Sequence, residues 1–137
     1  MAGMKARPPF GWIGEMKLTV GSEHVIDFAS DGMPVVFSTP KMIGLIERTA
    51  RESLYSFLEP NERTVGVEVD IKHLAPTPLG AQVTILTRVI GGEGPFIDFT
   101  TEVRDQHEVL ARGLHKRAVI RVESFARRVA RKAAALG

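Results

Sequence analysis

The chain has 137 residues, of which 44% are hydrophobic and 25% charged, and a formal net charge of +2. This length suits one domain, and this composition is that of an ordinary globular protein with its own core. The lack of cysteine excludes a disulfide framework and thiolate chemistry, and no apolar run approaches the roughly 18–20 residues of a membrane span. We therefore expect no membrane partner and, because no signal-peptide-like region opens the chain, a cytoplasmic location.

The first part of the chain predicts short elements and loops. Residues 1–12 are expected to form a loose arm, from which Phe10 and Trp12 are available to pack against the body. Residues 15–20 predict a strand that continues at 24–28 after a turn, and 29–38 predict a loop.

Residues 39–58 carry the apolar period of a helix, with Thr39 as its cap and Pro40 at the first helical position. Successive side chains are about 100° apart around a helix, which places these apolar residues on one arc: Met42, Ile43, Ile46, Ala50, Leu54, Phe57 and Leu58. Glu47 falls inside this arc. Because a carboxylate that loses water is costly unless it is paired, Glu47 needs a charge or hydrogen-bond partner.

Four strand candidates follow, at residues 63–74, 81–90, 96–104 and 109–122, and the last two connections are short enough for hairpin loops. Short strands, one long helix and four long strands predict an α+β fold. A sheet wrapped around a single central helix, the hotdog arrangement, buries that helix most simply. Such a sheet leaves an edge exposed, so we expect dimerisation.

Basic residues gather at the end of the chain, where residues 123–137 form a basic tail. The cations from 121 onward are Arg121, Arg127, Arg128, Arg131 and Lys132, against the single anion Glu123. We expect a solvated, partly helical tail, with contact to an anionic ligand or partner as the alternative. The few aromatic residues mostly follow apolar patterns, so a nucleic-acid partner is not expected.

The strand at 63–74 places a histidine on the face that meets the helix. Alternation assigns five side chains to that face: Val65, Val67, Val69, Ile71 and His73. Thr39 projects near the arc of Glu47, so three polar side chains point into one apolar interior. From the residues alone, the trio Thr39, Glu47 and His73 is either a structural network or an active site.

Other chemistry finds little support in the sequence. His24, His107 and His115 lack the spacing of metal ligands, and His115 shares a strand face with Arg117, in the core or at an interface. No P-loop, dinucleotide fingerprint or G-x-S-x-G elbow is present. We therefore expect no metal site.

Several segments together carry a resemblance to a known family. They are 38–47 (STPKMIGLIE), Gly66, 73–80 (HLAPTPLG) and 115–120 (HKRAVI). In this order and at these intervals they resemble the hotdog-fold acyl-CoA thioesterases related to fluoroacetyl-CoA thioesterase. The resemblance runs from about residue 36 to 125.

The resemblance implies that Thr39, Glu47 and His73 are the catalytic group of a thioester hydrolase. It also implies that Gly66 and Arg117 lie at or near the site. The protein would be a homodimer that binds acyl-CoA at the subunit interface, without a cofactor other than the coenzyme A of substrate and product.

One departure concerns the acyl pocket. The loop 29–38 lacks the two phenylalanines that cover this pocket in the fluoroacetyl-CoA enzyme, and Ser30 and Met33 stand there instead. Met33 is therefore a predicted substrate contact. The expected substrate is a short or polar acyl-CoA rather than fluoroacetyl-CoA in particular.

The mechanism leaves alternatives open. Glu47 would act as nucleophile or as general base, Thr39 would hold its carboxylate, and His73 would orient the reacting group or protonate the thiolate. Gly66 would polarise the carbonyl through its N–H. Arg117 would bind an anionic part of coenzyme A or form a pair across the dimer, unless it is simply a solvated strand residue. The competing function is a non-catalytic hotdog module that binds acyl-CoA or a related metabolite; a hotdog dehydratase is a weaker third alternative.

Overall fold

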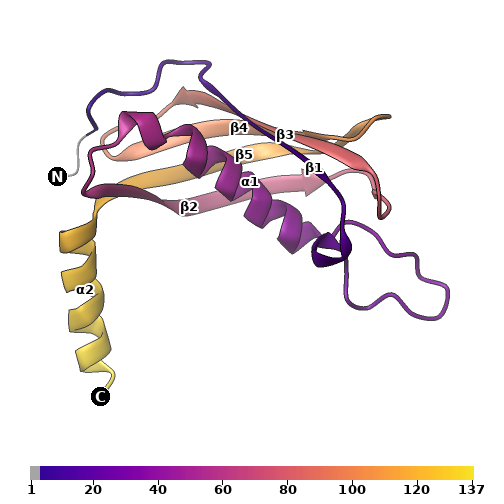
Figure 1. Cartoon of the computed structure of the whole chain (residues 1–137). Helices are drawn as coiled ribbons and strands as arrows, with labels where there is room; N and C mark the ends of the chain where they lie inside the picture. Colours follow the sequence, from indigo (N-terminus) through magenta and orange to yellow (C-terminus); the bar gives the residue numbers. More distant parts are fainter. Residues whose placement is uncertain (1–3) are drawn as a thin grey trace.

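The computed structural model describes residues 4–137 and consists of one antiparallel sheet, one long helix across it and a second helix at the C-terminus (Figure 1). The elements in chain order are β1 (Ile13–Thr19), the 3-10 turn η1 (Ser22–His24), α1 (Thr39–Ser53), the 3-10 turn η2 (Tyr55–Phe57), β2 (Glu62–His73), β3 (Gln82–Gly91), β4 (Phe96–Arg104), β5 (Val109–Arg121) and α2 (Val122–Ala135). The sheet order is β1-β3-β4-β5-β2. The predicted α+β fold is confirmed.

The apolar arc of α1 forms the centre of the core, as its period predicts. Met42, Ile46 and Ala50 are fully buried, and they pack into two clusters with the inward residues of β3, β4 and β5. The core therefore lies between α1 and one face of the sheet, and the opposite face of the sheet is left uncovered by any helix (Figure 1).

The helix ends earlier than the predicted residue 58. α1 stops at Ser53, and a 3-10 turn carries the chain through Phe57. The Trp12 indole Nε1–H donates to the Ser53 carbonyl at 2.9 Å, and the Phe57 N–H bonds instead to the Leu54 carbonyl. The tighter turn follows because a carbonyl that a longer α-helix would use internally is already taken by a distant side chain.

The second part of the predicted first strand is wrong. Residues 24–28 form no strand, and their only sheet-like contact is the isolated bridge between Val25 and Phe37. The Gly21 N–H donates to His24 Nδ1 at 2.9 Å and holds a turn here.

A register shift in β2 corrects the predicted face pattern. Gly66 pairs with Arg117 of β5, whereas Glu68 pairs with Lys116, so Val67 is a bulge residue. Before the bulge the even-numbered residues face α1, and after it the odd-numbered residues do. The prediction is confirmed for Val69 and the residues after it, and it is wrong for Val65 and Val67.

The two ends of the described chain differ in their contacts with the body. In the arm, the Lys5 N–H donates to Phe57 at 3.1 Å, the Arg7 guanidinium donates to three carbonyls around the β3–β4 hairpin, and Trp12 packs edge-on against Phe57. The tail is helical over Val122–Ala135, and every residue of it is exposed. Among residues 4–137, no helix is both long and apolar enough to cross a membrane.

Candidate active site

The start of α1 brings Thr39 and His73 together. The helix cap is Ser38, one residue earlier than predicted, so Thr39 is already the first helical residue and its hydroxyl is not used for capping. That hydroxyl is hydrogen-bonded to His73 Nδ1, at the end of β2, with a separation of 2.7 Å. Two of the three predicted catalytic residues are therefore in direct contact.

The environment of His73 favours a neutral ring. Burial lowers its pKa below the usual 6.5, and the backbone of Ala75 acts in the opposite direction more weakly. Its Nε2 is buried and has no hydrogen-bond partner within the described part of the chain. With Nδ1 held by Thr39, Nε2 is the ring atom left for a reacting group.

Thr39 and His73 line a pocket of about 330 Å³ together with Met33, the predicted substrate contact. The rest of the lining is apolar: Ile26, Phe28, Val36, Phe37, Leu74, Ala75 and Pro76. The sequence reasoning missed Phe28, because residues 24–28 were assigned to a strand. Their lack of a strand partner could not be seen from the local pattern.

Glu47 lies in a second cluster of polar side chains, eight residues after Thr39 on α1. Its Oε2 is 3.5 Å from Nη1 of Arg117, and its side chain is 36% exposed. A Cβ on Gly66 would overlap the Glu47 carboxylate, so only glycine leaves room for this side chain at this point of β2. The predicted need of Glu47 for a charge partner is confirmed, and Gly66 and Arg117 both lie beside it.

Arg117 is only 3% exposed, so the alternative of a solvated strand arginine is excluded. Its Nε donates to Thr64 Oγ1 at 2.8 Å and its Nη2 to the Thr64 carbonyl at 2.9 Å. Burial lowers the pKa of the Arg117 guanidinium, and the charge of Glu47 opposes that change. The arginine is held in place and presents Nη1 towards Glu47.

His115 completes this cluster from β5. Its Nδ1 is 2.9 Å from the Glu68 carbonyl and its Nε2 is 3.3 Å from Arg117 Nη1. Since arginine only donates, Nε2 must accept and the ring proton must sit on Nδ1. Burial lowers the pKa of His115, which agrees with this neutral form. The sequence predicts His115 either in the core or at an interface. In the single chain it lies in the core, with Phe99 stacked on its ring.

Within one chain the two clusters are separate. Thr39 and Glu47 are eight residues apart on one helix, a rise of about 12 Å. No hydrogen bond or ion pair joins Glu47 to Thr39 or His73 among the residues the structure describes. Nor do these residues contain a group of three histidine, aspartate or glutamate side chains that could hold a metal ion.

Comparisons with known proteins identify the family. The family model described as fluoroacetyl-CoA-specific thioesterase, FlK, matches residues 20–123. The fluoroacetyl-CoA thioesterase of Streptantibioticus cattleyicolor is 33% identical over 99 residues, which are 72% of this chain and 71% of that protein.

Solved structures give the same result. The structure of FlK superposes with a TM-score of 0.84 at 27% identity, over 93% of this chain and 98% of that one. A thioesterase superfamily member from Thermus thermophilus superposes with a TM-score of 0.82 at 25% identity, over 95% and 99% of the two chains. One variant of FlK has been solved with fluoroacetate and CoA, and another variant with acetyl-CoA. The predicted hotdog fold is thereby confirmed, and the chain belongs to the fluoroacetyl-CoA-specific thioesterase (FlK) family, a family of thioester hydrolases in the hotdog-fold thioesterase superfamily.

Proposed function

We propose that this protein hydrolyses a short or polar acyl-CoA thioester, with Thr39, Glu47 and His73 as its catalytic group. The observation that carries the proposal is the hydrogen bond between Thr39 and His73 in the wall of the 330 Å³ pocket. A neutral imidazole whose Nδ1 is fixed and whose Nε2 is free is suited to contact a reacting group. The CoA and acetyl-CoA complexes of two FlK variants support acyl-CoA as the substrate class.

The proposal includes a homodimer formed along β2. Within residues 4–137 this strand has β5 as its only sheet neighbour, so these residues leave its other edge unpaired. Val67 is 52% exposed and Val69 36% exposed, which is unusual for apolar side chains on a free edge. Antiparallel pairing of two β2 edges around a two-fold axis would cover them and join the two sheets.

Along β2, the dimer also shortens the distance between the two clusters. Glu47 sits beside Gly66, seven residues or roughly 23 Å from His73 along its own β2. If two β2 strands pair over their full length, the partner's Gly66 lies opposite Val69, only four residues or about 13 Å from His73. We therefore assign to each Thr39–His73 pair the Glu47 carboxylate of the second copy.

In this site Glu47 acts as the general base. Its side chain is partly exposed and can reach a water molecule, whose proton it takes as the oxygen attacks the thioester carbonyl. His73 and the Gly66 N–H stabilise the carbonyl oxygen as charge develops on it. The carbon–sulfur bond then breaks, and Glu47 returns the proton to the thiolate. Arg117 acts through Glu47 in this scheme, and direct contact between Arg117 and coenzyme A stays a prediction.

The test combines single variants with a mixed dimer. Glu47→Gln and His73→Ala should each lower thiol release from an acyl-CoA panel by roughly 10²–10⁴-fold. In a dimer with one Glu47→Gln chain and one His73→Ala chain, one of the two sites retains both residues. About half of the wild-type turnover should return.

Two results would count against the proposal. A mixed dimer as inactive as its parents would place each site within one chain. Tight acyl-CoA binding by the wild-type protein without thiol release across the panel would favour the non-catalytic module.

A further inference from the structure

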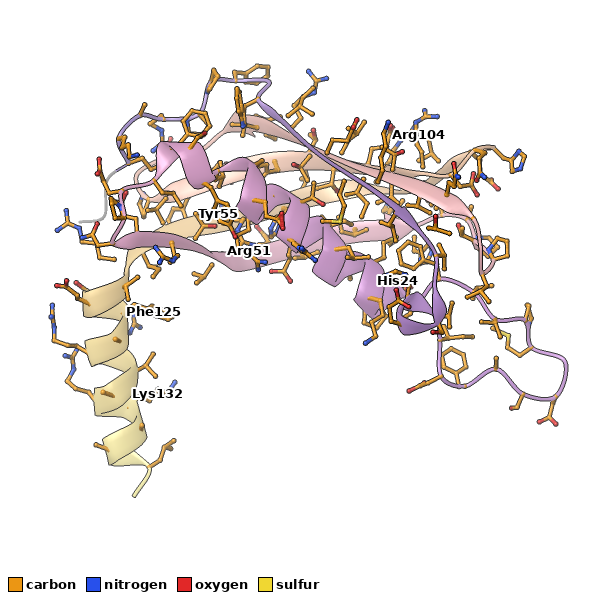
Figure 2. The ribbon with its side chains drawn as sticks, viewed as in Figure 1. His24, Arg51, Tyr55, Arg104, Phe125 and Lys132 are labelled. Carbon is orange, nitrogen blue, oxygen red and sulfur yellow. The ribbon has the colours of Figure 1, made fainter. Side chains whose placement is uncertain are left out.

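The C-terminal helix α2 has an apolar face, most of which the described part of its own chain leaves exposed. One arc carries these apolar residues: Val122, Phe125, Ala126, Val129, Ala130 and Ala133. The opposite arc carries Arg127, Arg128 and Arg131. Phe125 is 42% exposed and lies at the edge of a surface pocket that Pro95 and Val119 also line, whereas Val129 is 52% exposed. Figure 2 shows the rest of α2, including Lys132, standing clear of the body. A helix of this kind needs a partner for its apolar face.

The start of α2 is fixed beside the first residue of β2. The helix follows β5 directly, and the Val122 N–H donates to the Asn61 carbonyl at 2.9 Å. In Figure 1, α2 leaves the body at this end and extends beyond the β2 edge, whereas the loop at residues 25–37 leaves at the opposite end. Its 14 residues span about 21 Å, enough to pass a neighbouring strand and the helix layer beneath it.

Two-fold pairing of β2 brings these opposite ends together. In the homodimer of the proposed function, on which this inference rests, Glu62 of one copy lies beside the partner's His73. The α2 helix of one copy therefore lies at the end of the partner that holds the Thr39–His73 pocket.

The pocket end is complementary to α2 in both polarity and charge. Around the pocket, Phe28 is 65% exposed, Leu74 56% and Met33 44%. The segment from 21 to 37 carries Glu23, Asp27 and Asp31 and no lysine or arginine. α2 carries four cations and one anion. Apolar surface would meet apolar surface, and a basic rim would meet an acidic loop.

We propose that α2 of each subunit lies across the partner's Thr39–His73 pocket and forms its outer wall. Phe125 and Val129 pack against the partner's Phe28, Met33 and Leu74, and the basic arc faces the partner's acidic loop and solvent. Each pocket is then complete only in the dimer. The wall shields the acyl group from bulk solvent and limits its length, so α2 helps to determine substrate specificity.

The absence of cysteine from the chain allows a direct test by cross-linking. The full-length protein carrying Val129→Cys and Leu74→Cys is treated with a short bismaleimide and run on a denaturing gel. Within one chain the start of α2 and Leu74 are separated by the length of β2, roughly 36 Å, so only a contact between subunits can link these positions. The matched control carries Arg131→Cys, on the opposite arc of α2, with Leu74→Cys, and the three single variants reveal links between identical positions.

We expect a covalent dimer from the Val129/Leu74 pair, at least tenfold more than from the Arg131/Leu74 pair or the single variants. A non-covalent dimer on a sizing column without this difference would overturn the inference and leave the homodimer standing. A monomer on that column would remove the homodimer of the proposed function as well. A third result would assign the apolar face of α2 to a membrane surface: the Val129/Leu74 pair gives no covalent dimer, and the wild-type chain binds anionic vesicles whereas Phe125→Asp does not. The gel measures contact between subunits and does not depend on catalysis. If the protein is cross-linked as expected but releases no thiol from acyl-CoA, only the proposed hydrolysis is rejected.

Discussion

Gly66→Ala adds one methyl group at the point of β2 where the Glu47 side chain lies against the strand. Its Cβ would overlap the Glu47 carboxylate and would lie 3.6 Å from Arg117 Nη1, an ordinary contact. Gly66 does not have a positive φ, so alanine fits the backbone here without strain. The effect of the substitution is therefore confined to the position of one carboxylate.

The expected magnitudes separate activity from stability. The obstacle is the flexible end of a partly exposed side chain, which has to move by roughly 1 Å to reach van der Waals contact. Such a movement of a catalytic group can cost about 100-fold in kcat, or about 2.7 kcal/mol of transition-state stabilisation. The free energy of unfolding should change by less than about 1 kcal/mol, since the core around α1 is untouched.

The assay is acyl-CoA turnover followed by free-thiol release, together with urea unfolding of the same preparations. The matched control is Gly66→Ala in a Glu47→Gln background, where the methyl group should cost nothing further because the base is already absent. Wild-type kcat in Gly66→Ala would refute the placement of the reacting water beside Glu47. A further loss in the double variant would show that the methyl group acts by another route.

Three other predictions follow from contacts of this chain. Thr39→Val removes the hydrogen bond to His73 and should lower kcat by roughly 10–100-fold, whereas Thr39→Ser should retain most of it; equal rates in the two variants would count against the pair. Burial lowers the pKa of His73 and His115, so the unfolded chain binds more protons in acid than the folded chain does. The stability that the two histidines contribute is therefore present above about pH 6.5 and is lost as the pH falls through their folded-state pKa values. Urea unfolding midpoints measured between about pH 7.5 and 5 should show this loss, and His115→Gln should flatten the curve. A flat wild-type curve would contradict this. Trp12→Phe removes the bond to the Ser53 carbonyl and should cost about 1 kcal/mol in thermal unfolding at unchanged kcat; an unshifted melting temperature would mean that this bond does not hold the helix end.

The candidate site was only partly predictable from the sequence. The helical period predicts Glu47 on the inner arc of α1, and a carboxylate there needs a charge partner, which the structure shows to be Arg117. The Thr64 and His115 contacts that hold Arg117 were not predictable, because they depend on which residues face each other across β2 and β5. Phe28 was missed for a similar reason, since a residue pattern does not show whether a strand finds a neighbour.

The β2 strand shows the limit most clearly. Alternation assigned Val67 to the inner face, and one bulge moved it to the open edge and brought Gly66 inward beneath Glu47. A bulge depends on the register with β5, and register is a property of two strands rather than of one. The same shift put the small residue where the carboxylate needed space.

The sequence by itself determined the class of elements, the buried stripe of α1 and the presence of an acid, an imidazole and a hydroxyl near one interior. These features follow from periodicity and residue chemistry, which act over a few neighbouring residues. Only the tertiary structure decided that Thr39 meets His73 while Glu47 meets Arg117, and that the two clusters lie about 12 Å apart along a rigid helix. The reason is physical: a helix fixes the distances along itself, but contacts between elements depend on strand register, bulges and an edge left open for a second chain.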